Sequence, residues 1–320
     1  MKEFYDYEQQ IEKLEKDGLI IDDEDAAKDY LRLEGYYNVI NGYAHIFKDK
    51  NNKKFITNVK FDTIKNLYEF DKALRSVVYK YTSLIECHIK ALIAHEFSRV
   101  HGVDENEYLK DSSFSVNSKS REKIEKLIED CKKTIAEALD SRSNKYREYI
   151  SHNKKAHGHV PMWVLVRALT FGAVSIFYKN MKDEEKSAIA QNFGVSSEKL
   201  ANILEVVVSF RNIVAHGERT FCARLPRTRL STNLSIARKL NIPKNSKGEN
   251  KFGRNDFLSL LICCKYMLSP LDFASFISEL KIVLEILERE QTPSMLGKIK
   301  IQMGLSGKSW ELLPRLIIND

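Results

Sequence analysis

The sequence predicts an all-α protein: a helical bundle with an N-terminal helical extension, polar loop insertions and a C-terminal tail packed on the body. Gly and Pro are scarce, at 13 and 6 of 320 residues, and Lys, Glu, Leu, Ile and Ala dominate. This composition favours long amphipathic helices over a turn-rich β architecture. Apolar residues recur at steps of three and four through 61–100, the pattern of a long helix with one buried face. With 43% apolar residues, the chain can bury one large core or two smaller, joined ones.

The N-terminal segment, residues 1–60, is expected to be helical. A short helix over 7–16 is followed by Gly18, a residue type common after helix C-termini. A second helix is predicted to begin at the carboxylates of 23–25, which suit a helix N-terminus, and to run until Gly35 interrupts it. Aromatic residues crowd the stretch that follows; they are expected to pack in the core, although aromatics also stack on unpaired bases. They are Tyr36, Tyr37, Tyr43 and Phe47.

Residues 61–290 are expected to form the main helical core, with a polar insertion at about 101–160. Within this insertion, 101–120 is predicted to be a loop and 119–140 a charged amphipathic helix. A polar, histidine-bearing connection is expected over 141–161.

The centre of the core is predicted to hold three helices. An apolar run over 162–178 is expected to be one buried helix, and two more helices are expected over 183–193 and 197–216. A serine can cap the start of the last helix, and Gly217 is expected to end it just past His216.

The C-terminal part is predicted to begin with a basic, glycine-bearing loop over 241–256. Helical spacing returns over 256–289. The remaining residues, 291–320, are expected to form a tail that carries a tryptophan and docks on the body.

Charge and cysteine content restrict the classes of function. The formal charge of +7 lets a basic surface attract phosphate backbones, although 44 acidic residues keep that field local. No apolar run reaches the roughly 18–20 residues that cross a bilayer and no secretory signal is recognised, so we expect a cytoplasmic protein with no membrane partner. Adjacent Cys263 and Cys264 cannot form an ordinary disulfide, so free buried thiols are expected. No cysteine lies at zinc-ligand spacing, and neither a metal nor a cofactor is expected.

The stretch SFRNIVAHGERTF, residues 209–221, carries the candidate chemistry. On a helix, Asn212 and His216 lie four residues apart and share one face, close enough for the amide to orient the imidazole. Arg211 lies five residues from His216, so its long side chain must wrap back to share the site. An imidazole can move the 2′-hydroxyl or leaving-group proton while a guanidinium stabilises the phosphate. These residues therefore suit RNA cleavage without metal, whereas DNA, which lacks the 2′-hydroxyl, is not an expected substrate.

The arginine-to-histidine spacing is not specific by itself, because Arg147 and His152 repeat it. In that second pair Glu148 stands where the first has asparagine, and we interpret it as a chance occurrence.

Basic residues near His216 and near a second group of histidines are candidate RNA contacts. His152, His157 and His159 have Lys154 and Lys155 between them. We expect a solvated loop here that touches RNA or no partner, rather than a metal site, since no carboxylate or cysteine shares the cluster. Guanidiniums spaced closely after the 209–221 stretch also suit an RNA backbone. They belong to Arg219, Arg224, Arg227 and Arg229.

Charged residues in the long predicted helix have the spacing of ion pairs. Glu69 and Asp71 lie beside Arg75, and Glu86 lies four residues before Lys90. We expect surface or interhelical pairs here and no catalytic carboxylate.

The segment RNIVAH resembles the Arg-Asn-x-x-Ala-His motif of HEPN ribonucleases, and four other segments resemble the abortive-infection (Abi) family that carries this domain. The four segments lie in the family's order along nearly the entire chain. They are 8–43, with GYYNVINGY at its end; 67–97, LYEFDKALRSVVYKYTSLIECHIKALIAHEF; 161–181, PMWVLVRALTFGAVSIFYKNM; and 303–314, MGLSGKSWELLP.

This resemblance implies a HEPN-type helical bundle, usually a homodimer that brings two such motifs together across its two-fold axis and cuts RNA during phage infection. It carries over to Arg211, Asn212 and His216 as catalytic residues. Some relatives are linked to small non-coding RNAs or to antitoxins, so a small RNA regulator is a candidate partner. Family members often continue with Ala-His-His-x-Arg-Leu-Trp/Tyr-Asn, whereas this chain has Gly217 in place of the second histidine and Cys222 in place of the motif's asparagine. The departure puts substrate positioning in doubt more than the core chemistry.

Two functions of other classes stay open. A non-cleaving RNA-binding regulator or sensor would hold a structured small RNA with the same arginines. A structural helical partner in a toxin–antitoxin pair would bind another protein and retain no RNA.

Overall fold

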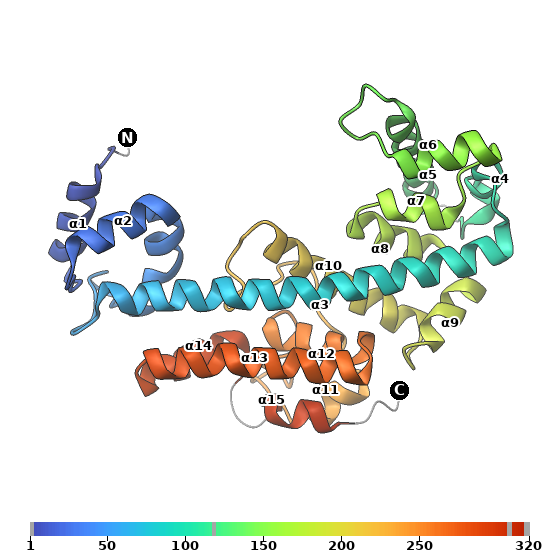
Figure 1. Cartoon of the computed structure of the whole chain (residues 1–320). Helices are drawn as coiled ribbons and strands as arrows, with labels where there is room; N and C mark the ends of the chain where they lie inside the picture. Colours follow the sequence, from blue (N-terminus) through green and yellow to red (C-terminus); the bar gives the residue numbers. More distant parts are fainter. Residues whose placement is uncertain (1–2, 117–119, 306–308, 317–320) are drawn as a thin grey trace.

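A single long helix organises the molecule. The computed structural model describes residues 3–116, 120–305 and 309–316, and within these ranges the regular elements are helices, with β structure limited to isolated bridges. The helix α3 (Phe61–His101), 41 residues long, spans the molecule, and the other helices pack along it or gather at its two ends (Figure 1). The all-α prediction is confirmed.

The α3 helix forms where the sequence predicts it because its apolar residues repeat with helical spacing and meet neighbours on several sides. Gly102 ends it with φ +77°, and the Gly102 amide donates to Ser98 O at 2.9 Å. Of the apolar positions expected to define its face, Val77 and Leu92 are partly buried and the others are buried. The buried positions are Ile64, Leu67, Tyr68, Leu74, Val78, Tyr81, Ile85 and Ile89.

The N-terminal helices α1 (Tyr7–Lys16) and α2 (Glu24–Glu34) lie at one end of α3 (Figure 1). Asp6 caps α1 by accepting from Gln9 N at 2.8 Å, and Asp23 caps α2 by accepting from Ala26 N at 3.0 Å. Both predicted helices are confirmed.

Short helical turns carry the aromatic stretch that follows α2. They are a π-helical turn, η1 (Tyr37–Asn41), and a 3₁₀ turn, η2 (Ala44–Phe47). Tyr43 and Phe47 are buried and Tyr36 is partly buried, as expected for core packing. Tyr37 is 73% exposed, so the expectation is wrong for this residue.

The other end of α3 holds the polar insertion, which is more helical than predicted. Two short turns replace the expected loop, and the amphipathic helix forms as expected, although Lys119 lies outside the described residues. The connection after it contains a helix of ten residues that Gly158 terminates at φ +78°. The expectation that this segment would be a connection without a helix was wrong, because its polar residues suit an exposed helix. These elements are α4 (Glu105–Tyr108), η3 (Asp111–Ser113), α5 (Arg121–Leu139) and α6 (Glu148–His157).

The apolar run after Pro161 forms two helices, α7 (Met162–Ala168) and α8 (Phe171–Asn180). The prediction of one buried helix is wrong because Thr170 starts a new helix by accepting from Ala173 N at 3.2 Å. The next helix, α9 (Asp183–Gln191), confirms the prediction for that segment.

The helix α10 (Ser197–Ala215) packs on α3, α8 and α12, and α13 packs along α3. Residues 241–250 lack regular helix, and helical spacing returns as two helices because Pro270 starts a new one. The tail that follows contains helices, and Trp310 packs against the core. These C-terminal elements are α11 (Ser235–Lys239), α12 (Phe257–Met267), α13 (Pro270–Glu290), α14 (Pro293–Met303), α15 (Ser309–Leu312) and η4 (Leu313–Arg315).

Buried apolar residues form one cluster that reaches from Ile11 to Leu313. The division of the chain into 1–60, 61–290 and 291–320 stays a prediction. Burial of the thiols matches the expectation at Cys131, Cys263 and Cys264, whereas Cys222 is partly buried and Cys87 is exposed. Among the described residues, each helix is too short or too polar to cross a lipid bilayer.

Candidate functional site

The end of α10 has the geometry that the sequence predicts. Gly217 has φ +69°; its amide donates to Val214 O at 3.2 Å, and the Glu218 amide donates to Ile213 O at 3.0 Å. This pair of hydrogen bonds is a Schellman motif, in which a left-handed residue closes the helix. His216 is therefore the C-cap residue, and the chain turns back from the helix immediately after it.

Replacing Gly217 by alanine is expected to lower the free energy of unfolding by about 1 kcal/mol, because an L side chain is strained at a positive φ. No atom lies within 4 Å of the added methyl group, so steric contact contributes nothing. Gly297→Ala is a matched control, since Gly297 lies inside α14 with equally open space and ordinary helical φ. Urea unfolding of both variants should show a loss for the first and no loss for the second. Equal losses would contradict the assigned conformation.

The catalytic candidates lie on the surface of an otherwise buried helix. Asn212 and His216 are exposed and one helical turn apart, while the apolar residues of α10 face the core. The His216 backbone amide donates to Asn212 O at 3.0 Å, but within the described ranges the side-chain amide of Asn212 makes no hydrogen bond to the imidazole. The imidazole and the amide are thus accessible to a ligand from solvent. The buried positions of α10 are Leu200, Ile203, Leu204, Val206, Val207, Phe210 and Val214.

Arg211 reaches across to α3 and pairs with a carboxylate there. Its Nη2 lies 3.1 Å from Glu86 Oε2, and its side chain is 25% exposed. Its Nε is buried without a hydrogen-bond partner in the part of the chain that the structure describes. A guanidinium has five N–H donors, so this pair fixes the group while leaving donors for an anion.

Glu86 also connects Arg211 to another part of the fold. Its Oε1 lies 2.8 Å from Lys90 Nζ, one turn along α3, and that ammonium donates to Leu169 O at 2.8 Å. The expected Glu86–Lys90 pair is confirmed. The contact to Arg211 was missed, because a sequence shows pairs within one helix but not which helix lies opposite.

A buried carboxylate anchors the chain just after the motif. Asp71 on α3 has a fully buried side chain and accepts from the amides of Thr220, at 3.1 Å, and Phe221, at 2.8 Å. It also accepts from Tyr43 Oη at 2.6 Å and from Arg75 Nη1 at 2.9 Å. Burial raises the pKa of the Asp71 carboxyl, and these four donors oppose that shift. Asp71 therefore joins α3, the N-terminal segment and the residues that follow His216.

Arg219 makes a second connection to the N-terminal segment, since its Nη1 donates to Gly42 O at 2.7 Å. Burial lowers the pKa of the nearby His45, and the positive charge of Arg219 lowers it further. His45 therefore stays neutral at pH 7 beside the basic segment. Sequence reasoning missed this histidine because it lies 171 residues from His216 along the chain.

The remaining arginines of the basic segment are on the surface. Arg224, Arg227 and Arg229 are exposed, and Arg224 Nη1 donates only to the neighbouring Ala223 O, at 3.0 Å. Among the described residues, these three arginines form no ion pair, so their charges are available to a partner.

The second group of basic candidates lies elsewhere, on α6, which packs on α5 and α7 at the far end of α3 (Figure 1). Lys154 is half-buried and pairs with Glu105, while Lys155 is exposed. The structure does not place this group beside α10. It corrects the expectation of a loop, because the lysines and two of the three histidines lie on a helix.

The histidine rings near these lysines are neighbours. The ring centroids of His152 and His157 are 6.4 Å apart, and those of His157 and His159 are 6.3 Å apart. Within the described ranges, no group of three His, Cys, Asp or Glu side chains has the geometry of a metal site. Arg147 Nη1 donates to Tyr146 O at 2.9 Å.

These features define an all-α protein in which a buried helix ends in an exposed histidine and continues into a basic segment. The profile of the family described as Abi-like protein matches residues 29–222, more than half of the chain, and the chain belongs to that family. The matched region contains α3, α10 and the motif from Arg211 to His216. The stretch 303–314, which also resembles the Abi family, lies outside it. Searches of curated proteins and of solved structures gave no significant match.

Proposed function

We propose that this chain is a metal-independent endoribonuclease of the HEPN type that acts in abortive infection, with Arg211, Asn212 and His216 at its catalytic centre. The observation that carries the proposal is the exposed imidazole one turn from an exposed amide, next to a guanidinium held by Glu86. Family membership supports the role in phage defence.

The chemistry follows from these groups. His216 removes the proton from a 2′-hydroxyl or gives one to the departing 5′-oxygen, and Arg211 binds the phosphate that becomes more negative in the transition state. The 2′-oxygen forms a bond to phosphorus as the bond to the 5′-oxygen breaks. The products are a 2′,3′-cyclic phosphate and a 5′-hydroxyl. Asn212 orients the imidazole once the substrate is bound.

Glu86 supports this role for Arg211 by holding one end of the guanidinium in place. A pre-positioned arginine loses less conformational freedom on binding phosphate than a free one. A homodimer that places two His216 side chains at one cleft would supply both an acid and a base, and we include such a dimer in the proposal.

Arg219, Arg224, Arg227 and Arg229 guide the RNA backbone toward His216. Their position supports this role, because the segment leaves the helix directly after the catalytic residues and three of its guanidiniums form no ion pair in the described part of the chain. Lys154 and Lys155 lie on α6 and would contact RNA only at a distance from the cut.

Cleavage of single-stranded RNA by the purified protein is expected to proceed in EDTA, because the mechanism uses no metal. An oligonucleotide with one 2′-deoxynucleotide at the cut position should resist at that position, since the attacking hydroxyl is missing. End-group analysis should find cyclic phosphate and 5′-hydroxyl. Strict dependence on a divalent metal, or equal cutting of DNA, would contradict the mechanism.

A second candidate is an RNA-binding regulator that holds a small RNA without cutting it. Arg224, Arg227 and Arg229, which are exposed and form no ion pair with any residue that the structure describes, favour it independently of His216. In that case RNA would copurify intact, and its salt-dependent binding would survive His216→Ala.

A further inference from the structure

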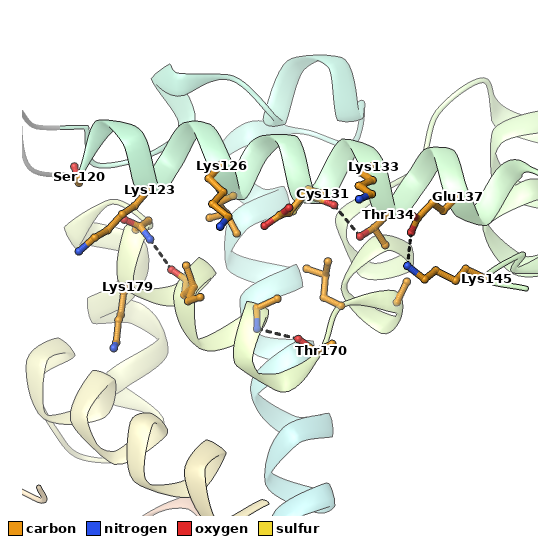
Figure 2. Close-up of a pocket in the computed structure, with 17 residues that line it drawn as sticks. Ser120, Lys123, Lys126, Cys131, Lys133, Thr134, Glu137, Lys145, Thr170 and Lys179 are labelled. Carbon is orange, nitrogen blue, oxygen red and sulfur yellow. Dashed lines mark hydrogen bonds and ion pairs between the residues drawn. The ribbon is translucent and has the colours of Figure 1, made fainter. Parts of the chain in front are cut away.

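A groove of about 940 Å³ lies between α5 and α8, apart from the candidate catalytic residues (Figure 2). Its volume is in the range of sites for small organic ligands, roughly 300–1,000 Å³. The family resemblance assigns it no role, and sequence analysis singled out none of its charged residues.

Lysines dominate the charged lining of this groove. Five lysines face two carboxylates there, Asp130 and Glu137. Figure 2 shows Lys123 from α5 and Lys179 from α8 reaching the same end of the groove, while the other end is closed by a pair between Lys145 and Glu137, 2.9 Å apart.

Two of the five lysines have acidic partners, and three have none among the described residues. Lys179 pairs with Glu205 of α10. Lys123, Lys126 and Lys133 make no ion pair within the ranges that the structure describes. The groove therefore presents an excess of positive charge, since these three lysines share the lining with one further carboxylate, that of Asp130.

The wall between the lysines is apolar, and two of its neutral polar side chains already donate hydrogen bonds within the fold. Thr134 Oγ1 donates to Asp130 O at 2.8 Å, and Asn180 Nδ2 donates to Ile176 O at 2.7 Å. A ligand is thus held by charge and by apolar contact. The apolar lining consists of Leu127, Cys131, Ala168, Leu169, Ala173 and Ile176.

We propose that this groove binds a nucleoside phosphate, either a free nucleotide or the end of a short oligoribonucleotide. The phosphates contact Lys123, Lys126 and Lys133, and the base lies on the apolar wall. A helical peptide fits less well. A helix is about 10 Å across, so two turns of it fill the groove, and two turns bring few carboxylates near the lysines. A nucleotide carries several charges and a flat apolar face in a smaller body.

The groove is connected to the candidate catalytic arginine by direct contacts. Leu169 lines the groove, and its carbonyl accepts from Lys90 Nζ at 2.8 Å. Lys90 Nζ lies 2.8 Å from Glu86 Oε1, and Glu86 Oε2 lies 3.1 Å from Arg211 Nη2. Any shift of the wall at Leu169 therefore changes how Glu86 is shared between Lys90 and Arg211.

This connection gives the ligand a regulatory effect, which rests on the proposed nuclease function. A bound nucleotide displaces the wall at Leu169 and releases Lys90 from the carbonyl. Lys90 then pairs more closely with Glu86, which weakens the contact between Glu86 and Arg211 and loosens the guanidinium that Glu86 positions. The expected result is slower RNA cleavage when the groove is occupied.

Binding is tested apart from catalysis, in a His216→Ala background. Fluorescence anisotropy with a fluorescent ATP analogue and with a labelled tetraribonucleotide distinguishes the two sources of the ligand. The double variant K126E/K133E should weaken binding about tenfold or more, with a weaker salt dependence. The control is the double variant K281E/K298E, which changes the charge by the same amount at two exposed lysines outside the groove and should leave the affinity unchanged. Failure of both probes to bind, an unchanged affinity in K126E/K133E, or equal binding of tetraglutamate overturns the site.

The coupling is tested with the parent chain and Lys90→Gln, which keeps a donor for Leu169 but removes the charge. The nucleotide should bind both proteins equally and slow RNA cleavage only in the parent. Equal slowing in both, or no slowing in the parent, overturns the coupling. Because binding is measured in an inactive background, failure of the nuclease proposal leaves the test of the groove intact.

Discussion

Replacing His216 by alanine is expected to reduce RNA cleavage by about 10³-fold, the contribution typical of a general acid or base. The imidazole is exposed at the C-cap of α10, and the helix end is closed by backbone hydrogen bonds of Gly217 and Glu218. The variant should therefore unfold at the parent's temperature. Single-turnover cleavage of a labelled single-stranded RNA in EDTA measures the loss.

The chain supplies a matched control in the second arginine–histidine pair. His152 is also exposed and also lies five residues after an arginine, but on α6 at the far end of α3 (Figure 1). His152→Ala should cut RNA at the parent's rate. If His216→Ala and the parent cut equally fast, the assignment of the catalytic centre fails, and loss in both variants would show that the assay does not report on one site.

Replacing Asp71 by alanine is expected to lower the free energy of unfolding by about 3–5 kcal/mol. The carboxylate is fully buried. Its removal leaves Arg75 without its ion-pair partner and leaves the backbone amides of Thr220 and Phe221 without this hydrogen-bond acceptor. Removing one member of a buried charge pair has this cost because the other charge stays in a medium of low polarity. Urea unfolding monitored by circular dichroism measures the change.

Asp62→Ala is the control for this prediction, since Asp62 lies on the same helix with a side chain 63% exposed and 3.8 Å from Lys65. Its loss should be below about 1 kcal/mol. Similar effects of the two substitutions would contradict the anchoring role of Asp71. At temperatures where Asp71→Ala stays folded, its RNA cleavage should still fall, because the residues that follow His216 lose their attachment to α3.

Asp71 and Glu86 of α3 position the two parts of the candidate site, the Arg211 side chain and the basic segment after His216. Glu86 holds Arg211, and Asp71, four turns earlier on α3, fixes the segment that starts after His216. The pair of carboxylates thus defines the position of the guanidinium and the direction of the basic segment relative to one rigid element.

Local elements of the fold were predictable because they depend on residues close together in the sequence. Helical spacing predicts α3, Asp23 and Gly35 delimit α2, and Gly217 ends α10 next to His216. One wrong prediction depended on a single residue. Thr170 divides the apolar run into α7 and α8 because its hydroxyl caps a new helix.

The motif from Arg211 to His216, its place at a helix end and the membership of the Abi-like family all follow from the amino-acid sequence, whereas the exposure of Asn212 and His216 is seen only in the structure. Tertiary structure alone decided that Glu86 meets Arg211 and that Asp71 binds the backbone of Thr220 and Phe221. The physical reason is that spacing along a helix specifies which side chains share a face. Which side chain lies opposite depends on packing between segments more than a hundred residues apart.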